Sequence, residues 1–160
     1  WGGVGFWIPD GFKFLNISFK HWGYFLYGIF WLLVFLFGRK KMSPYTLAAL
    51  AALSFFFLPT RVHERYLYPA FAFLIIVASQ IKSKILISLV ILLSLIHFLN
   101  LYYVYVYYNE IYLNLPKVLY NSQIYNFLKD YGKEFSILST AIFVLISLIL
   151  IKHIYEIRKD

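Results

Sequence analysis

The chain of 160 residues contains no cysteine and few charged side chains. Without cysteine, neither a disulfide framework nor a thiolate metal site is possible. Only 14% of the residues are charged, with Asp and Glu together numbering 7, whereas an average soluble domain is about 25% charged. The sequence also lacks a Gly-rich phosphate loop after a strand, a nucleophile elbow and an HExxH helix. These absences argue against nucleotide-sugar binding on a soluble fold.

Apolar and aromatic residues dominate instead, at 62% and 22% of the chain. This is more apolar surface than one small core can hide, and disordered chains are poor in such residues. The net charge of +8 comes from Lys and Arg in short clusters between apolar runs, which is typical of membrane loops. The composition therefore predicts a protein of the bilayer that does not bind nucleic acid.

Five apolar segments approach the roughly 20 helical residues that a bilayer core about 30 Å thick requires. The predicted spans cover residues 21–37, 44–58, 66–79, 85–108 and 136–151. The predicted outer loops are 1–20, 59–65 and 109–135. We therefore expect an all-α, polytopic transmembrane bundle. Because the chain starts at Trp1 without a signal-peptide pattern, we expect residues 1–160 to be the C-terminal transmembrane region of a longer protein.

The distribution of positive charge predicts the orientation of these spans. Lys and Arg are denser in residues 38–44, 80–84 and 152–160 than in the other connections, and cytoplasmic loops carry such an excess. The N-terminal segment is then outside and the C-terminal tail cytoplasmic. In the last outer loop Ile124, Phe127, Leu128 and Tyr131 recur at helical spacing, which predicts a short amphipathic helix along the membrane.

The most informative stretch is the loop after the second span, where Arg61, His63, Glu64 and Arg65 fall within five positions. The apolar runs on both sides are short for full spans, so the charged loop is expected partly below the headgroups. If the turn continues into helix, Arg61 and Arg65 share a face, and two guanidinium groups suit a phosphate. The alternative is an interfacial hairpin whose arginines bind lipid headgroups.

The sequence of this loop resembles the outer hairpin near the C-terminus of a group of prokaryotic polytopic glycosyltransferases. These enzymes are related to dolichyl-phosphate-mannose-protein mannosyltransferases and to the mannosyltransferases of GPI-anchor assembly. The matching hairpin is Pro59-Thr60-Arg61-Val62-His63-Glu64-Arg65-Tyr66-Leu67-Tyr68-Pro69. A weaker upstream match consists of Trp1-Gly2-Gly3, Trp7, Pro9-Asp10, Phe14, Ser18 and Trp22-Gly23. The resemblance covers about residues 1–80.

The resemblance implies the GT-C architecture and an active site on the non-cytoplasmic side of a prokaryotic cell membrane. Such enzymes transfer a sugar, here mannose by resemblance, from a polyprenyl-phosphate carrier to an acceptor. By analogy Arg61 and Arg65 stabilise the phosphate leaving group, and His63 and Tyr66 belong to the donor site. Glu64 orients an arginine or, as the sharper option, acts as general base.

The essential acidic residue of these enzymes generally lies in the first outer loop, near their N-terminus. The catalytic base is therefore expected upstream of Trp1, and we expect the chain alone to be inactive. No cofactor is identified by the resemblance.

Other polar residues have two readings each. His97 and Asn100 lie within the fourth predicted span, where an interhelical hydrogen bond competes with a substrate pathway. Asp10 forms a turn or approaches an acceptor. His21, His63 and Asp10 match no standard metal site. Two further classes stay open: a transporter or lipid-translocating protein with an anionic-substrate site, and a structural membrane subunit.

Overall fold

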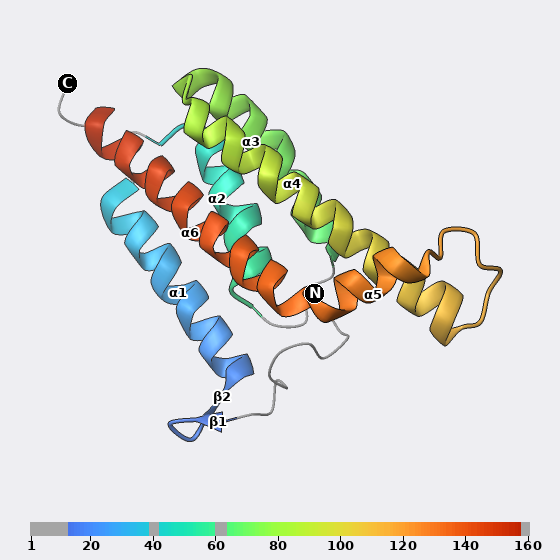
Figure 1. The fold of residues 1–160 in the computed structure, drawn as a ribbon. Helices are drawn as coiled ribbons and strands as arrows, with labels where there is room; N and C mark the ends of the chain where they lie inside the picture. Colours follow the sequence, from blue (N-terminus) through green and yellow to red (C-terminus); the bar gives the residue numbers. More distant parts are fainter. Residues whose placement is uncertain (1–12, 39–41, 60–63, 158–160) are drawn as a thin grey trace.

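The computed structural model describes residues 13–38, 42–59 and 64–157, which form a helical bundle with one small hairpin (Figure 1). The elements are β1 (Lys13–Phe14), β2 (Ile17–Ser18), α1 (Phe19–Gly38), α2 (Pro44–Phe57), the 3₁₀ helix η1 (Glu64–Leu67), α3 (Tyr68–Ile81), α4 (Lys84–Tyr105), its π-helical continuation η2 (Val106–Tyr112), α5 (Ser122–Asp130) and α6 (Gly132–Ile157). The all-α expectation is confirmed, with two strands of two residues as the addition.

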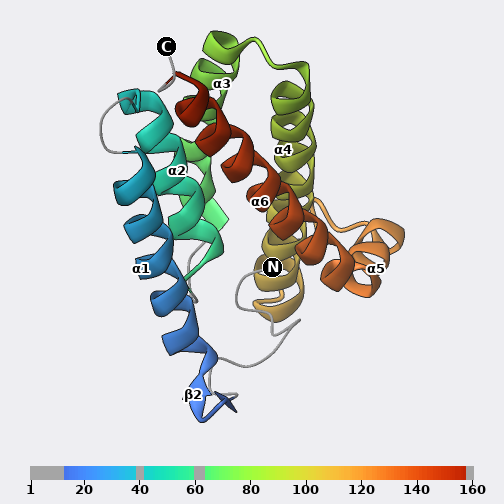
Figure 2. The ribbon, with the colours of Figure 1, turned by 90° about the vertical axis from the view of Figure 1, so that its left-hand side faces the viewer.

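Consecutive long helices run in alternating directions (Figures 1 and 2). The end of α1, the start of α2, the α3–α4 connection and the C-terminus lie at one end of the bundle. The β-hairpin, the start of α3, and α5 lie at the other. We call the second end the hairpin end. This grouping matches the two sets of connections that the charge distribution separates.

Three helices are long and apolar enough to cross a membrane, over Phe19–Leu36, Lys84–Tyr112 and Gly132–His153. By length and composition they indicate a membrane protein. Helices α2 and α3 have 14 residues each, so each is about 21 Å long and shorter than a bilayer core. These two short helices pack against each other more extensively than any other pair.

Local capping explains where several helices begin and end. Ser43 caps α2 by accepting a hydrogen bond from the Thr46 amide at 3.2 Å, and Pro44 follows in the first turn, where it loses no hydrogen bond. Ser83 caps α4 in the same way through the Leu86 amide. Lys82 ends α3 in the left-handed conformation, with φ of 54°. The serine caps explain why α2 begins at Pro44 and α4 at Lys84.

Helical structure occupies most of the predicted outer loop 109–135. The fourth helix continues through η2 to Tyr112, and α6 already begins at Gly132 rather than at residue 136. The short helix expected in this region is present as α5, which Asn121 caps. Its Leu128 is buried, whereas Ile124, Phe127 and Tyr131 are exposed. The apolar face is therefore only partly covered by protein.

The β-hairpin was not predicted from the sequence. Leu15 and Asn16 form its two-residue turn with φ of 51° and 61°, and Phe14 pairs with Ile17. Two left-handed residues give a turn whose twist matches paired strands, and Asn tolerates this conformation better than Leu does. The indole of Trp22 donates a hydrogen bond to the Phe14 carbonyl at 3.0 Å, which ties the hairpin to α1.

The core lies between α2, α3, α4 and α6. Leu50, Leu53, Leu74, Leu86 and Ile146 are fully buried there. Helix α1 lies at the edge, and most of its large apolar side chains are exposed. A second, smaller cluster lies toward the hairpin end, where the side chains of α5 meet the end of α4: Tyr103, Val106, Tyr125 and Leu128.

Candidate functional site

The predicted donor-binding loop lies at the hairpin end, between α2 and α3. Arg61 and His63 lie outside the described residues, as does the predicted acceptor-loop residue Asp10. Glu64 is the first residue of the 3₁₀ helix η1. Arg65, in the same turn, is exposed. The grouping of these residues around one phosphate stays a prediction.

The 3₁₀ turn divides its side chains between the surface and the core. The Arg65 guanidinium carbon lies 5.8 Å from the ring centroid of Tyr66. The Tyr66 ring meets Phe55 of α2 edge-on, with centroids 6.0 Å apart. Leu67, the next residue, is fully buried in the bundle core. Leu67 thus anchors the turn and leaves Arg65 at the surface.

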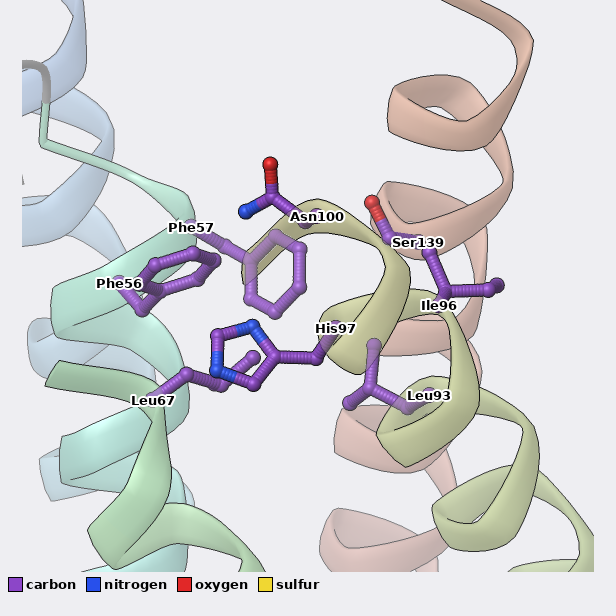
Figure 3. A pocket seen from close by; sticks show the side chains of 8 residues that line it. All are labelled: Phe56, Phe57, Leu67, Leu93, Ile96, His97, Asn100 and Ser139. Atoms are coloured by element: carbon purple, nitrogen blue, oxygen red, sulfur yellow. The ribbon is translucent and has the colours of Figure 1, made fainter. Parts of the chain in front are cut away.

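A polar cavity of about 30 Å³ lies beside this turn (Figure 3). Three α-helices and the 3₁₀ helix η1 line it. The lining residues are Phe56 and Phe57 from α2, Leu67 from η1, Leu93, Ile96, His97 and Asn100 from α4, and Ser139 from α6. Phe57 and Leu67 stand on the two sides of the predicted donor loop. The cavity therefore lies next to the loop that the sequence singles out, although its polar residues come from a distant part of the chain.

His97 and Asn100 supply the polar atoms that matter most in this cavity. Three residues apart on α4, they lie on one helix face, and their side chains are 5% and 6% exposed. Neither His97 Nε2 nor Asn100 Oδ1 has a hydrogen-bond partner within the described part of the chain. The interhelical hydrogen bond expected from the sequence is thus not formed by these two atoms. Buried polar atoms are nearly always bonded, so such a pair is unusual.

Aromatic rings hold the imidazole in place. The His97 ring centroid lies 5.9 Å from that of Phe56, 5.5 Å from that of Tyr68 and 5.6 Å from that of Phe71. In Figure 3 the imidazole points from α4 toward α2 and Leu67, away from Ser139. The Ser139 hydroxyl donates to the Ser136 carbonyl at 3.0 Å. This leaves His97 and Asn100 as the side chains with free hydrogen-bonding capacity at the cavity.

The sequence does not indicate that His97 and Asn100 lie near the arginine loop. The available signal was the pairing of two polar residues at helical spacing inside an apolar span. That signal does not say which neighbouring helix the pair faces. In the structure, His97 and Asn100 face the end of α2 and the segment just before α3.

An apolar groove of about 270 Å³ also reaches the end of α2. It is lined by Phe14, Phe19, Trp22, Gly23, Leu26 and Leu58. Leu58 is the C-cap of α2 and directly precedes the predicted loop 59–65. The groove and the polar cavity thus meet at the same short segment of chain.

Among the residues described, no group of three or more His, Asp or Glu side chains could hold a metal ion. Comparisons with protein-family models, with curated proteins and with solved structures found no match for this chain.

Proposed function

We propose that the chain is part of a membrane glycosyltransferase of the GT-C type, which transfers a sugar from a polyprenyl-phosphate carrier on the non-cytoplasmic side. The observation that carries the proposal is the polar cavity with His97 and Asn100 beside the predicted donor loop. The sequence resemblance supports it independently, since the matching residues lie in that loop.

The surroundings of the loop suit the three chemical parts of such a donor. The exposed Arg65 is a partner for phosphate, together with Arg61 by resemblance. The apolar groove that ends at Leu58 has the character to hold a prenyl chain. The polar cavity offers uncharged hydrogen-bonding groups of the kind that sugars need. An apolar, an anionic and a hydroxyl-bearing part are found together in a polyprenyl-phosphate sugar.

The roles of the individual residues are proposed from the resemblance. Arg61 and Arg65 stabilise the charge that develops on the leaving phosphate. His63 hydrogen-bonds the phosphate or the sugar, Tyr66 belongs to the same donor site, and Glu64 orients an arginine. The catalytic carboxylate and the acceptor are not assigned.

The proposal includes five crossings of the membrane. Helices α2 and α3 run side by side with the three long helices in both ribbon views. At about 21 Å each they fall short of a bilayer core of about 30 Å. The end of α2 and the start of η1 at the hairpin end then lie near headgroup depth, where a lipid-linked phosphate can reach Arg65.

The test is sugar transfer by the full natural polypeptide in lipid nanodiscs, with polyprenyl-phosphate mannose as donor. Arg65→Ala and Arg61→Ala are expected to lower transfer about 100-fold or more, the usual effect of removing a transition-state electrostatic partner. Arg65→Lys should recover part of the loss, because it keeps the charge but not the bidentate fork. Lys129→Ala, which removes an exposed cation of α5, is the matched control. Unchanged transfer in both arginine variants would contradict the phosphate role.

A transporter or lipid-translocating protein is the second candidate. It is favoured by the unpartnered polar atoms of His97 and Asn100 inside a spanning helix, because such groups also mark substrate pathways. The products separate the two functions. A transferase leaves free polyprenyl phosphate and a glycosylated acceptor, whereas a transporter moves its substrate unchanged.

A further inference from the structure

The atoms that face the polar cavity determine the chemistry of its ligand. His97 Nε2 donates or accepts a hydrogen bond according to its tautomer, and the Asn100 amide offers both a donor and an acceptor. Of the described residues that line the cavity, none is Lys, Arg, Asp or Glu. These residues offer no counter-charge to an anion or an ammonium group, and burial of either without one is costly. The cavity therefore suits a neutral group that both donates and accepts.

The size of the cavity narrows the ligand further. About 10–15 Å³ holds one water-sized group, so a cavity of about 30 Å³ accommodates a hydroxyl or a hydroxymethyl group and no sugar ring. The rings of Phe56 and Phe57 and the side chain of Leu67 form apolar walls around it. A small polar tip on a larger molecule fits this combination of walls and polar atoms.

The position of the cavity indicates which molecule carries that tip. The cavity touches Phe57 and Leu67, which flank the predicted phosphate-binding loop. In a polyprenyl-phosphate sugar, the sugar is bonded directly to the phosphate. A phosphate held by Arg65, two residues before the lining residue Leu67, therefore brings sugar hydroxyls toward this cavity.

We propose that His97 and Asn100 bind one hydroxyl or hydroxymethyl group of the transferred sugar and thereby contribute to the choice of sugar. This inference rests on the proposed glycosyltransferase function. The pair is thus a specificity determinant that lies outside the loop identified from the sequence.

The test compares lipid-linked donors that differ by single hydroxyl groups. The full natural polypeptide in nanodiscs receives polyprenyl-phosphate mannose, the 2-, 3-, 4- and 6-deoxy analogues, and polyprenyl-phosphate glucose. For the unaltered protein, we expect kcat/KM to be about 10–100-fold lower for one deoxy donor than for the parent donor. The missing hydroxyl group leaves buried polar atoms of the protein unpaired.

The variants His97→Leu and Asn100→Leu should lower kcat/KM for the parent donor and remove the penalty on that one deoxy donor. Parent and deoxy donors should then differ less than twofold, as expected when two changes remove the same interaction. Asn100→Ser is a milder substitution if either leucine variant fails to fold. Ser147→Ala is the matched control, since it removes a buried, unpartnered hydroxyl from α6 that does not line the cavity.

The possible outcomes separate this inference from the function on which it rests. If transfer occurs but every deoxy donor behaves alike in all variants, the cavity holds only water, and the inference is wrong while the proposed function stands. If the unaltered protein transfers none of the sugars and Arg65→Ala changes nothing, both fall. Loss of the penalty for one position in the His97 and Asn100 variants alone would establish the inference.

Discussion

Buried polar side chains at two places on the same long helix differ in their hydrogen-bond partners. His97 and Asn100, in the middle of the bundle, face a cavity with atoms that have no protein partner in the described chain. Glu110, in η2, is only 1% exposed. Its Oε1 accepts hydrogen bonds from the amides of Val118 and Leu119 at 3.0 and 2.8 Å, whereas its Oε2 has no partner in the described chain. Glu110 thus connects two parts of its own chain through one oxygen, whereas His97 and Asn100 line a cavity that can hold a small group.

The segment around 113–121 explains why Glu110 is needed. This segment has no regular structure, so its amides need acceptors elsewhere. The amides of Leu113 and Leu115 bond to carbonyls of η2, and those of Val118 and Leu119 bond to the Glu110 carboxyl group. Tyr102 also binds this segment. Its hydroxyl donates a hydrogen bond to the Leu119 carbonyl at 3.0 Å and accepts one from the Asn121 amide at 3.2 Å. A buried polar group with local backbone partners is therefore explained by structure alone. One that faces a cavity calls for a ligand.

The largest effect on stability is expected when the hydrogen bonds to Glu110 are removed. Glu110→Leu leaves the Leu119 amide without its acceptor and leaves the Val118 amide only the Pro116 carbonyl at 3.0 Å, and a typical hydrogen bond contributes about 0.5–1.5 kcal/mol. We expect the free energy of unfolding to fall by about 1–3 kcal/mol, measured by denaturant titration in mild detergent. Glu110→Gln, which keeps an acceptor oxygen, should lose less than half as much. Equal stability of Glu110→Leu and the unaltered protein would remove one side of the comparison.

An intermediate effect is expected at the start of α5. The Asn121 side chain accepts from the amides of Gln123 and Ile124 at 3.0 and 3.1 Å, and loss of such a cap typically costs about 1 kcal/mol. Asn121→Ala should therefore speed hydrogen exchange of the first amides of α5. Asn126→Ala, at an exposed position in the same helix, serves as control and should leave exchange almost unchanged. Identical exchange in the two variants would show that α5 does not depend on its cap.

The smallest effect on stability is expected at His97. Replacing a polar group that lacks a protein partner by an apolar one of similar size is nearly neutral or stabilising. His97→Leu should change the free energy of unfolding by no more than about 0.5 kcal/mol, in the same titration as the Glu110 variants. A loss comparable with that of Glu110→Leu would mean that the imidazole is structural, and the two sites would then be of one kind.

Much of the fold was predictable because helices depend on local sequence. The 3.6-residue repeat, the caps Ser43 and Ser83, and the apolar runs act within a few residues of one another. Helix α5 shows both the reach and the limit of this reasoning. Its existence followed from the spacing of apolar residues, but burial of Tyr125 and Leu128 depends on stacking against Tyr103, with Tyr103 and Tyr125 centroids 5.2 Å apart. The length of the neighbouring helices was less predictable, since polar side chains in η2 are compatible with a loop.

The sequence by itself determined the class of the protein, the approximate helices and the interest of the segment from Arg61 to Arg65, because composition and local spacing are sufficient for these. Only the tertiary structure decided that His97 and Asn100 meet the ends of α2 and α3 and that Glu110 binds the chain beyond it. Helix α4 is apolar on nearly all sides, so its pattern does not specify which face turns inward. That choice is made by long-range packing, in which four helices bury their shared surface at once.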